Sequence, residues 1–420
     1  MTTILSGPIF SKLNAAGDYG PDLQDVATKT VSQLLEIETH ANAPGMLLGM
    51  VQSGKTRAFL GVVACAFDSG FDVAVILTKG TVALSTQTVK RLNRDLKGAV
   101  DSELLHIHDV MQLPTGFTQW EANQKTIFVV KKQTDNLDRL RRALLEKDFL
   151  LSGKRVLFID DEADWASVGF KRTKGQIDLA KIAFQIDQLR QDLAAQAPPP
   201  AFLQVTATPY SLYLQPESVE INGQRYQRTR PSFTVLVPVH NRYIGGEFFF
   251  DDDHPLYKVG SRCYSVIESQ DELTALKRPD ARRVKPDNVL EKKAVDALRR
   301  GVASFIAAGS LRRWQQLSAN QRQSRYSFIV HTETNKPSHK WQSELVQWIV
   351  TALRDPNQAA RWKELFGNAC DDLEVSLAER ERLPEWAGQK FDLALPMPGR
   401  SEWLKLADEL LHALVIQVVN

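Results

Sequence analysis

Short apolar runs alternate with amphipathic stretches along roughly the first 240 residues of the chain. Each run has the length of a buried strand, and together they predict strands at 45–48, 73–77, 126–130, 155–159, 201–206 and 232–237. Between them, apolar residues recur every third or fourth position over 81–96 and 135–145, which predicts helices. Strands that alternate with helices are typical of an α/β fold with a parallel sheet.

The pattern changes after residue 240. Turn-forming and acidic residues precede a basic, proline-containing stretch, so we expect a linker and a helical insertion over 241–320. A strand-like run at 326–331 and a helical period at about 340–353 predict the start of a second α/β unit over 321–420. The last residues, 414–420, have the pattern of a buried strand. Because chains seldom end on a core strand, we expect the N-terminal part of a longer protein.

Composition and charge exclude several classes of protein. Hydrophobic residues make up 43% and charged residues 24% of the 420 residues, as in ordinary globular proteins. The net charge of +2 excludes a strongly basic tail. Cys65, Cys263 and Cys370 are far apart, which argues against a zinc site or a disulfide framework. With no signal peptide and no long apolar run, we expect a cytoplasmic protein without a membrane partner.

Residues 49–56 read Gly-Met-Val-Gln-Ser-Gly-Lys-Thr, a complete G-x-x-x-x-G-K-[ST] phosphate-binding loop. A strand precedes the motif and an apolar helix follows it, which favours a functional loop over a chance turn with a solvated lysine. ATP would contact the backbone and side chains of Gly49, Gln52, Ser53, Gly54, Lys55 and Thr56. Lys55 would place its charge near the β- and γ-phosphates, and the Thr56 hydroxyl would bind Mg²⁺.

An acidic run, Asp160-Asp161-Glu162-Ala163-Asp164, follows the apolar strand predicted at 155–159. Open α/β sheets bind ligands at the carboxyl ends of their strands. We therefore expect Asp161 to hold Mg²⁺ and Glu162 to polarise the water that attacks the γ-phosphate. With Lys55, Glu162 is the candidate catalytic residue. A solvated acidic loop is the alternative, and the order of the motifs favours the nucleotide site.

Thr206-Ala207-Thr208 follows the apolar run at 201–205. Small hydroxyl residues at a strand end can hydrogen-bond to the acidic site. We therefore expect these three residues to couple changes at the γ-phosphate to contacts elsewhere.

These three elements, in this order, resemble the first motor domain of superfamily 2 helicases and translocases, the class named for its Asp-Glu-Ala-Asp box. The amino-acid sequence resembles the Z-one domain family more specifically at 49–56, at 159–164 with Ala166-Ser167, and at 129–132. Members of that family are labelled putative endonucleases and occur in bacterial restriction-like and phage-defence gene clusters. The resemblance is good over about 40–250 and only in outline over 326–420.

The resemblance implies two RecA-like domains with ATP and Mg²⁺ in the cleft between them. The first would span 1–240, and the second would begin within 321–420. It also implies that Lys79, Thr81 and Gln87 correspond to a motif that contacts the DNA backbone, with Lys131 and Lys132 in a similar role. Lysines at strand ends suit phosphate contacts without base readout. Solvated loop lysines are the alternative.

Two departures from the family pattern matter. The arginines that reach the γ-phosphate from the second motor domain would lie beyond the last predicted strand, so we expect this chain to bind ATP but hydrolyse it poorly. No nuclease centre is visible either. The run at 371–374 lacks the lysine of a PD-D/E-x-K site, and His331 and His339 form no zinc spacing with a cysteine.

The function expected is an ATP-dependent, helicase-like translocase or remodeller of duplex DNA in a restriction or anti-phage system, with other defence proteins as partners. One alternative is a nucleotide-switched interaction subunit. Another is an endonuclease whose nuclease centre lies outside this chain. Lys55 and Glu162 favour hydrolysis, because a pure binding switch needs no residue that activates water.

Overall fold

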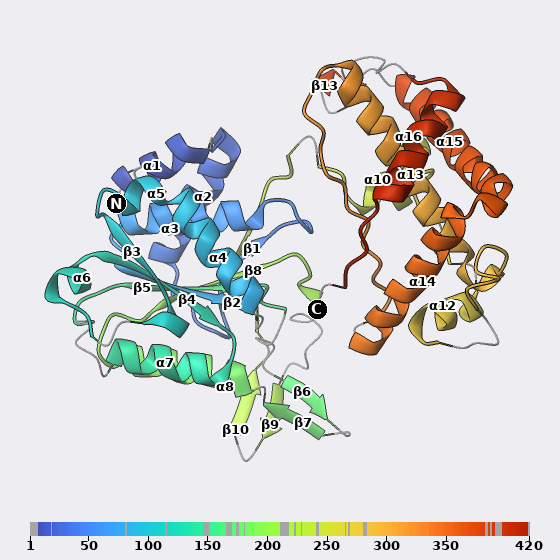
Figure 1. Ribbon diagram of the computed structural model, residues 1–420. Helices are drawn as coiled ribbons and strands as arrows, with labels where there is room; N and C mark the ends of the chain where they lie inside the picture. Colours follow the sequence, from blue (N-terminus) through green and yellow to red (C-terminus); the bar gives the residue numbers. More distant parts are fainter. Residues whose placement is uncertain are drawn as a thin grey trace. The chain divides into compact units, whose positions relative to one another are not determined.

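The computed structural model divides into two compact units, Met1–Tyr243 and Ile244–Asn420 (Figure 1). It describes residues 7–17, 19–79, 82–113, 116–145, 151–164, 170–173, 176–179, 181–210, 218–221, 224–227, 229–240, 243–264, 266–267, 269–279, 284–333, 335–382, 385–386, 389–390 and 397–418.

A parallel sheet forms the centre of the first unit. Seven strands are paired among the described residues, in the order β11-β1-β8-β5-β2-β4-β3. Their bounds are β1 Gly45–Leu48, β2 Val73–Thr78, β3 Leu105–Asp109, β4 Lys125–Lys131, β5 Val156–Asp161, β8 Ala201–Thr206 and β11 Phe233–Leu236. The predicted α/β class is confirmed. All the strands predicted up to residue 237 are present, and β3 is an additional strand.

Helices cover both faces of this sheet (Figure 1). On one face lie α1 Pro8–Gly17, α2 Pro21–Glu36, α3 Lys55–Asp68, α4 Val82–Asp95 and α5 Lys97–Val100. On the other face lie α7 Thr134–Leu145 and α8 Lys181–Ala194. In β2, Ala74 and Ile76 belong to the first core, and Val75 and Leu77 belong to the second. A strand buried on both faces needs apolar residues at every position, which explains the continuous run that predicted it.

Shorter elements lie between the strands and helices of the first unit along the chain. They are the 3₁₀-helix η1 Val110–Gln112, the helix α6 Gln119–Asn123, and two antiparallel hairpins, β6 Phe170–Thr173 with β7 Gln176–Leu179 and β9 Ser218–Ile221 with β10 Gln224–Gln227.

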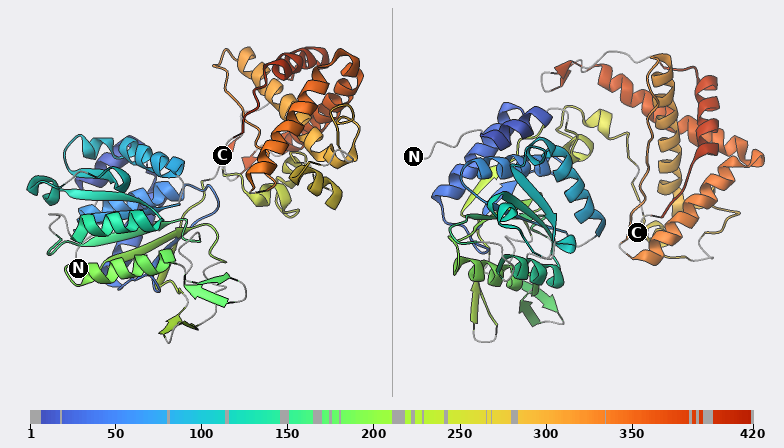
Figure 2. Two further views of the ribbon diagram at one scale, coloured as in Figure 1. Left: turned by 60° about the horizontal axis from the view of Figure 1, so that its bottom comes forward. Right: turned by 60° about the vertical axis from the view of Figure 1, so that its left-hand side comes forward.

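The second unit is built around a helical core. Its elements are α10 Gly246–Phe250, α11 Tyr257–Gly260, α12 Gln270–Lys277, η2 Lys293–Val295, α13 Asp296–Ser318, α14 Lys336–Arg354, η3 Pro356–Gln358, α15 Ala359–Glu381, a hairpin of β12 Glu385–Trp386 and β13 Gln389–Lys390, and α16 Arg400–Ala413. Helices α15 and α16 both pack against α13 (Figure 2). The side chain of Trp403 is fully buried, and its Nε1 donates to the Ala307 carbonyl at 3.0 Å. No described helix is long and apolar enough to cross a membrane.

The strands predicted at 326–331 and toward the end of the chain do not form among the described residues. Both segments lack regular secondary structure, and Ile329 and Val415 are 83% and 77% exposed. In the first segment, the Phe328 ring stacks on Phe305 of helix α13, with 5.5 Å between the ring centroids. A β-branched run without a strand beside it has no partner for its backbone hydrogen bonds. Helix α13, which lies inside the predicted 241–320 insertion, shares one core with α14, α15 and α16.

Candidate functional site

The pairing register brings the ends of neighbouring strands to one edge of the sheet. Leu48 of β1 pairs with Thr206 of β8, and Asp161 of β5 pairs with the residue before Thr206. Asp160 pairs with Leu77 of β2. The phosphate loop, the acidic run and the threonine run therefore all begin at the carboxyl edge, where open α/β sheets bind ligands.

The phosphate loop is shaped by two glycines. A Cβ on Gly49 would lie 2.9 Å from both Lys55 Cγ and Ser53 Oγ, so only glycine fits there. Gly54 has φ 95° and stands directly before α3, a left-handed conformation that glycine adopts without strain. Gln52 has φ 58°, which is uncommon for a residue with a side chain. The loop thus turns sharply into the N-terminus of α3, whose first N–H groups lack acceptors within the helix.

The Lys55 side chain lies across its own loop. Its Nζ donates to the Met50 carbonyl at 2.9 Å. Burial lowers the pKa of Lys55, and the carboxylates of Asp161, Glu162 and Asp164 oppose that shift. Thr56 follows in α3 and is half-buried. The hydroxyl of Ser53 is buried and has no hydrogen-bond partner among the described residues.

The acidic run places two carboxylates in different surroundings. Burial raises the pKa of Asp161 to about 6, with a further contribution from the charge of Glu162. The Glu162 backbone has φ 51°, and its N–H donates to Asp161 Oδ1 at 3.1 Å. The Glu162 side chain is 51% exposed. A largely buried carboxylate next to an exposed one suits a metal ligand beside a group that handles water.

The threonine run is hydrogen-bonded to the acidic run. Thr206 Oγ1 donates to Asp164 Oδ1 at 3.1 Å, and Thr208 Oγ1 donates to Asp164 Oδ2 at 2.6 Å. The Thr208 N–H donates in turn to Thr206 Oγ1 at 3.0 Å. Ala207, between them, is half-buried. This contact between small hydroxyl groups and the acidic site is the one that the sequence suggested, and Asp164 is the residue that makes it.

The residues predicted to contact DNA fall into separate groups. Lys79 follows β2, and its Nζ lies 3.3 Å from Glu162 Oε2 in an ion pair. Gln87 is exposed on α4. Thr81 lies outside the described residues, as do Ala166 and Ser167 of the family motif.

The expectation that Lys131 and Lys132 contact the DNA backbone is corrected by their burial. Lys132 is 2% exposed, and its Nζ lies 2.7 Å from Asp160 Oδ1. The same Nζ donates to the carbonyls of Asp161 and Glu162 at 2.7 and 2.9 Å. Lys131 is 6% exposed. Lys132 holds the acidic loop in place, because an ammonium buried against a carboxylate and two carbonyls is not available to a phosphate.

Tyr243 is a neighbour of the phosphate loop that the sequence did not reveal. Its hydroxyl donates to the Val51 carbonyl at 2.6 Å. The contact spans 192 residues of sequence, and no motif accompanies Tyr243. Only the fold could identify it.

These groups fit a magnesium-bound nucleoside triphosphate. The cradle that excludes a Cβ at Gly49, the unsatisfied Ser53 hydroxyl and the Lys55 ammonium suit phosphate oxygens. Thr56 and Asp161 offer the oxygen ligands that Mg²⁺ prefers.

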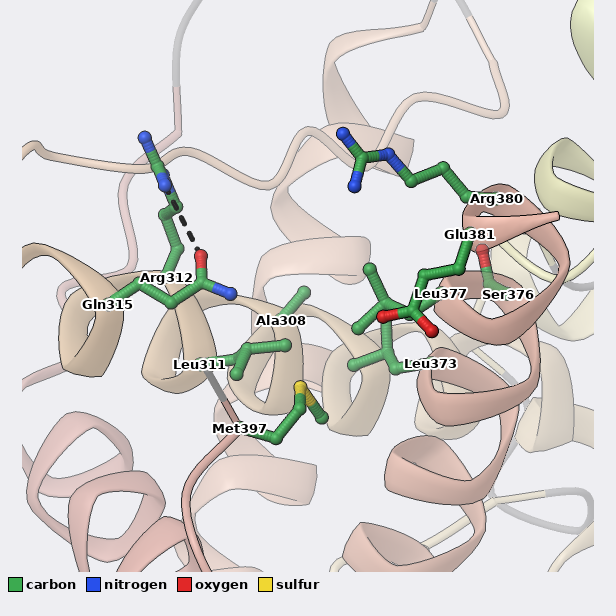
Figure 3. A pocket seen from close by; sticks show the side chains of 10 residues that line it. All are labelled: Ala308, Leu311, Arg312, Gln315, Leu373, Ser376, Leu377, Arg380, Glu381 and Met397. Carbon is green, nitrogen blue, oxygen red and sulfur yellow. Dashed lines mark hydrogen bonds between the residues drawn. The ribbon is translucent and has the colours of Figure 1, made fainter. Parts of the chain in front are cut away.

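The second unit contains a separate cavity of about 370 Å³ between α13 and α15 (Figure 3). Leucines and Met397 contribute apolar groups to its lining, and Arg312 and Arg380 contribute charged groups. None of the predicted site residues lines it.

No protein-family model matches the chain, and no curated protein matches it. Among solved structures, the DUF1998 helicase MrfA bound to DNA is 13% identical over 56% of this chain and 30% of that chain, with a TM-score of 0.34. The same helicase bound to DNA and AMPPNP is 14% identical over 56% of this chain and 30% of that chain, with a TM-score of 0.34. The Pyrococcus furiosus Hef helicase domain gives 12% identity over 93% of this chain and 68% of that chain, with a TM-score of 0.31.

This chain therefore spans less than a third of the MrfA chains that it matches. At such TM-scores, a function for this chain has to rest on the geometry of its own site.

Proposed function

We propose that this chain binds Mg-ATP at the carboxyl edge of its sheet and hydrolyses it as a helicase-like ATPase that acts on duplex DNA. One observation carries the proposal. The phosphate loop, the acidic run and the threonine run, which are far apart in sequence, start from the adjacent strands β1, β5 and β8. Three motifs with complementary chemistry at one edge make a nucleotide site a better explanation than three unrelated loops.

Each side chain has a distinct role in this proposal. Lys55 leaves the Met50 carbonyl and neutralises phosphate charge, while Thr56 and Asp161 provide oxygen ligands for Mg²⁺. The bound metal supplies charge neutralisation at the phosphates. Glu162, whose side chain is half exposed, accepts hydrogen bonds from the attacking water and orients it. Thr206 and Thr208 link this site, through Asp164, to the end of β8.

DNA would be held through its backbone. Lys79 offers an ammonium beside the acidic loop, and Gln87 offers an exposed amide on α4. Such groups suit phosphate contacts without base readout. The resemblance of the motifs to the Z-one domain family supports a translocase or remodeller in a restriction or anti-phage system.

The test is Mg-ATP binding and turnover by this chain, with and without duplex DNA, beside a Lys55→Ala variant. We expect binding in the unmodified chain and at least about tenfold weaker binding in the variant, because a hydrogen bond to a charged group contributes about 1.5–3 kcal/mol. Exposed Lys90 on α4 provides the matched control, Lys90→Ala, which should bind normally. Equal affinity of all three proteins would overturn the nucleotide site.

A further inference from the structure

Lys79 and Glu162 have different proposed tasks, and they form an ion pair with each other. The Lys79 Nζ lies 3.3 Å from Glu162 Oε2. The proposed function gives Lys79 a contact with a DNA phosphate and gives Glu162 the task of orienting water. While the pair is closed, the ammonium is not fully available to a phosphate and the carboxylate is not fully available to water.

The exposure of this ion pair allows either side chain to exchange its partner at little energetic cost. The two side chains are 40% and 51% exposed, and exposed ion pairs contribute little to stability. The neighbouring pair of Lys132 and Asp160 has side chains that are both 0% exposed. The acidic loop thus has one lysine that fixes it and one lysine that can be removed at little cost.

The backbone of Glu162 is held independently of its side chain. Its N–H donates to Asp161 Oδ1 at 3.1 Å, and its carbonyl accepts from Lys132 Nζ at 2.9 Å. Opening the ion pair with Lys79 therefore needs only a side-chain rotation. The loop that carries Asp161 does not have to move.

We propose that Lys79 holds Glu162 in an idle state and that a phosphate of the DNA backbone releases Glu162 by taking Lys79 as its partner. DNA and Glu162 then compete for one ammonium, so DNA binding is coupled to the availability of the water-orienting carboxylate. The inference rests on the proposed function and identifies how DNA regulates that same site. Such coupling is reciprocal: if DNA binding releases Glu162, then removing the Glu162 charge must strengthen DNA binding. This effect can be measured at equilibrium, without ATP turnover.

The experiment measures anisotropy of a fluorescently labelled, mixed-sequence duplex without nucleotide. Four proteins form the cycle: the unmodified chain, Glu162→Gln, Lys79→Gln and the double variant. We expect Glu162→Gln to tighten DNA binding about two- to fivefold, the range of an exposed ion pair, because it frees Lys79. In the Lys79→Gln background, the same substitution should have no effect.

The possible outcomes separate this inference from the function on which it rests. Equal tightening in both backgrounds means a general loss of negative charge and overturns the competition. DNA binding without any effect of Glu162→Gln also overturns it, while leaving DNA binding by the chain intact. Absence of DNA binding in all four proteins overturns the proposed function itself.

A kinetic readout tests the idle state directly. Lys79→Gln should raise the turnover of Mg-ATP in the absence of DNA and reduce its further stimulation by DNA. The matched control is Lys90→Gln, at an exposed position on α4, which should leave both rates unchanged. An unaltered DNA-free rate in Lys79→Gln, with measurable turnover in the unmodified chain, would contradict the release of Glu162.

Discussion

Lys132 and Asp160 form an ion pair from which solvent is excluded, with 2.7 Å between Nζ and Oδ1 and neither side chain exposed. Lys132 directly follows β4, and Asp160 lies in β5. Strand β2 separates these two strands in the sheet. The pair therefore ties together two strands that are not neighbours, directly beneath the acidic loop.

Replacing Lys132 with methionine should destabilise the first unit strongly. The change leaves Asp160 as a buried charge without its ammonium, and breaking a buried pair in this way costs about 3–5 kcal/mol. Urea unfolding followed by circular dichroism measures the effect, with the exposed Lys90→Met as control. The double variant Lys132→Met/Asp160→Leu should recover much of the loss, because it removes both charges. A Lys132→Met protein as stable as the control would contradict this role.

Glu162→Gln should separate binding from turnover. Glutamine keeps the size of the side chain but loses the negative charge and one acceptor oxygen, so it cannot accept a proton from water. Mg-ATP affinity should therefore stay within about twofold while turnover falls by about 10²–10⁴-fold. Titration with a fluorescent ATP analogue and phosphate release measure the two quantities. Exposed Glu38→Gln serves as the control. Full turnover in Glu162→Gln would remove Glu162 from the mechanism.

Asp161 should make folding stability depend on pH. Burial raises the pKa of its carboxyl to about 6, so between about pH 4 and pH 6 the folded chain keeps a proton that the unfolded chain releases. The contribution of Asp161 to stability is thus fully present below about pH 4 and is lost as the pH rises through about 6. Asn in its place cannot ionise. The stability of Asp161→Asn relative to the unmodified chain should therefore increase from pH 4 to pH 7, as measured by urea midpoints. A constant difference would contradict the raised pKa.

Tyr243→Phe should loosen the phosphate loop. The Tyr243 hydroxyl donates to the Val51 carbonyl at 2.6 Å, and a hydrogen bond of this kind contributes about 0.5–1.5 kcal/mol. We expect faster hydrogen exchange in peptides that cover 49–54 and nucleotide binding weaker by about two- to tenfold. Tyr210, which is 69% exposed, offers the control Tyr210→Phe. Unchanged exchange at 49–54 would show that the hydroxyl does not restrain the loop.

The sequence predicted a strand best where the residues of that strand alone form a recognisable apolar run. Strands β2 and β5 are buried on both faces, so each reads as an unbroken apolar run. Strand β3 was missed because its His106 and His108 interrupt that pattern at the edge of the sheet. The run at 326–331 shows the opposite case: strand-forming residues stay unpaired where the neighbouring elements are helices.

The position of the candidate site was predictable to the extent that it lies in local motifs. The phosphate loop and the acidic run could be placed from spacing and flanking strands. The burial of Lys132 and the contact of Tyr243 could not, since each depends on residues brought close by the fold. A lysine after a strand looks the same in sequence whether its partner is solvent or a carboxylate two strands away.

The position of β1 in the sheet has a consequence for the order of events during synthesis. This strand, which carries the phosphate loop, pairs with β8 and β11 and with no earlier strand among the described residues. The loop therefore emerges from the ribosome long before the strands that hold it. It can take its final position between these strands only after residue 236, the end of β11, has been made. Until then the apolar residues of β1 need protection from aggregation, as non-local parallel pairings generally do.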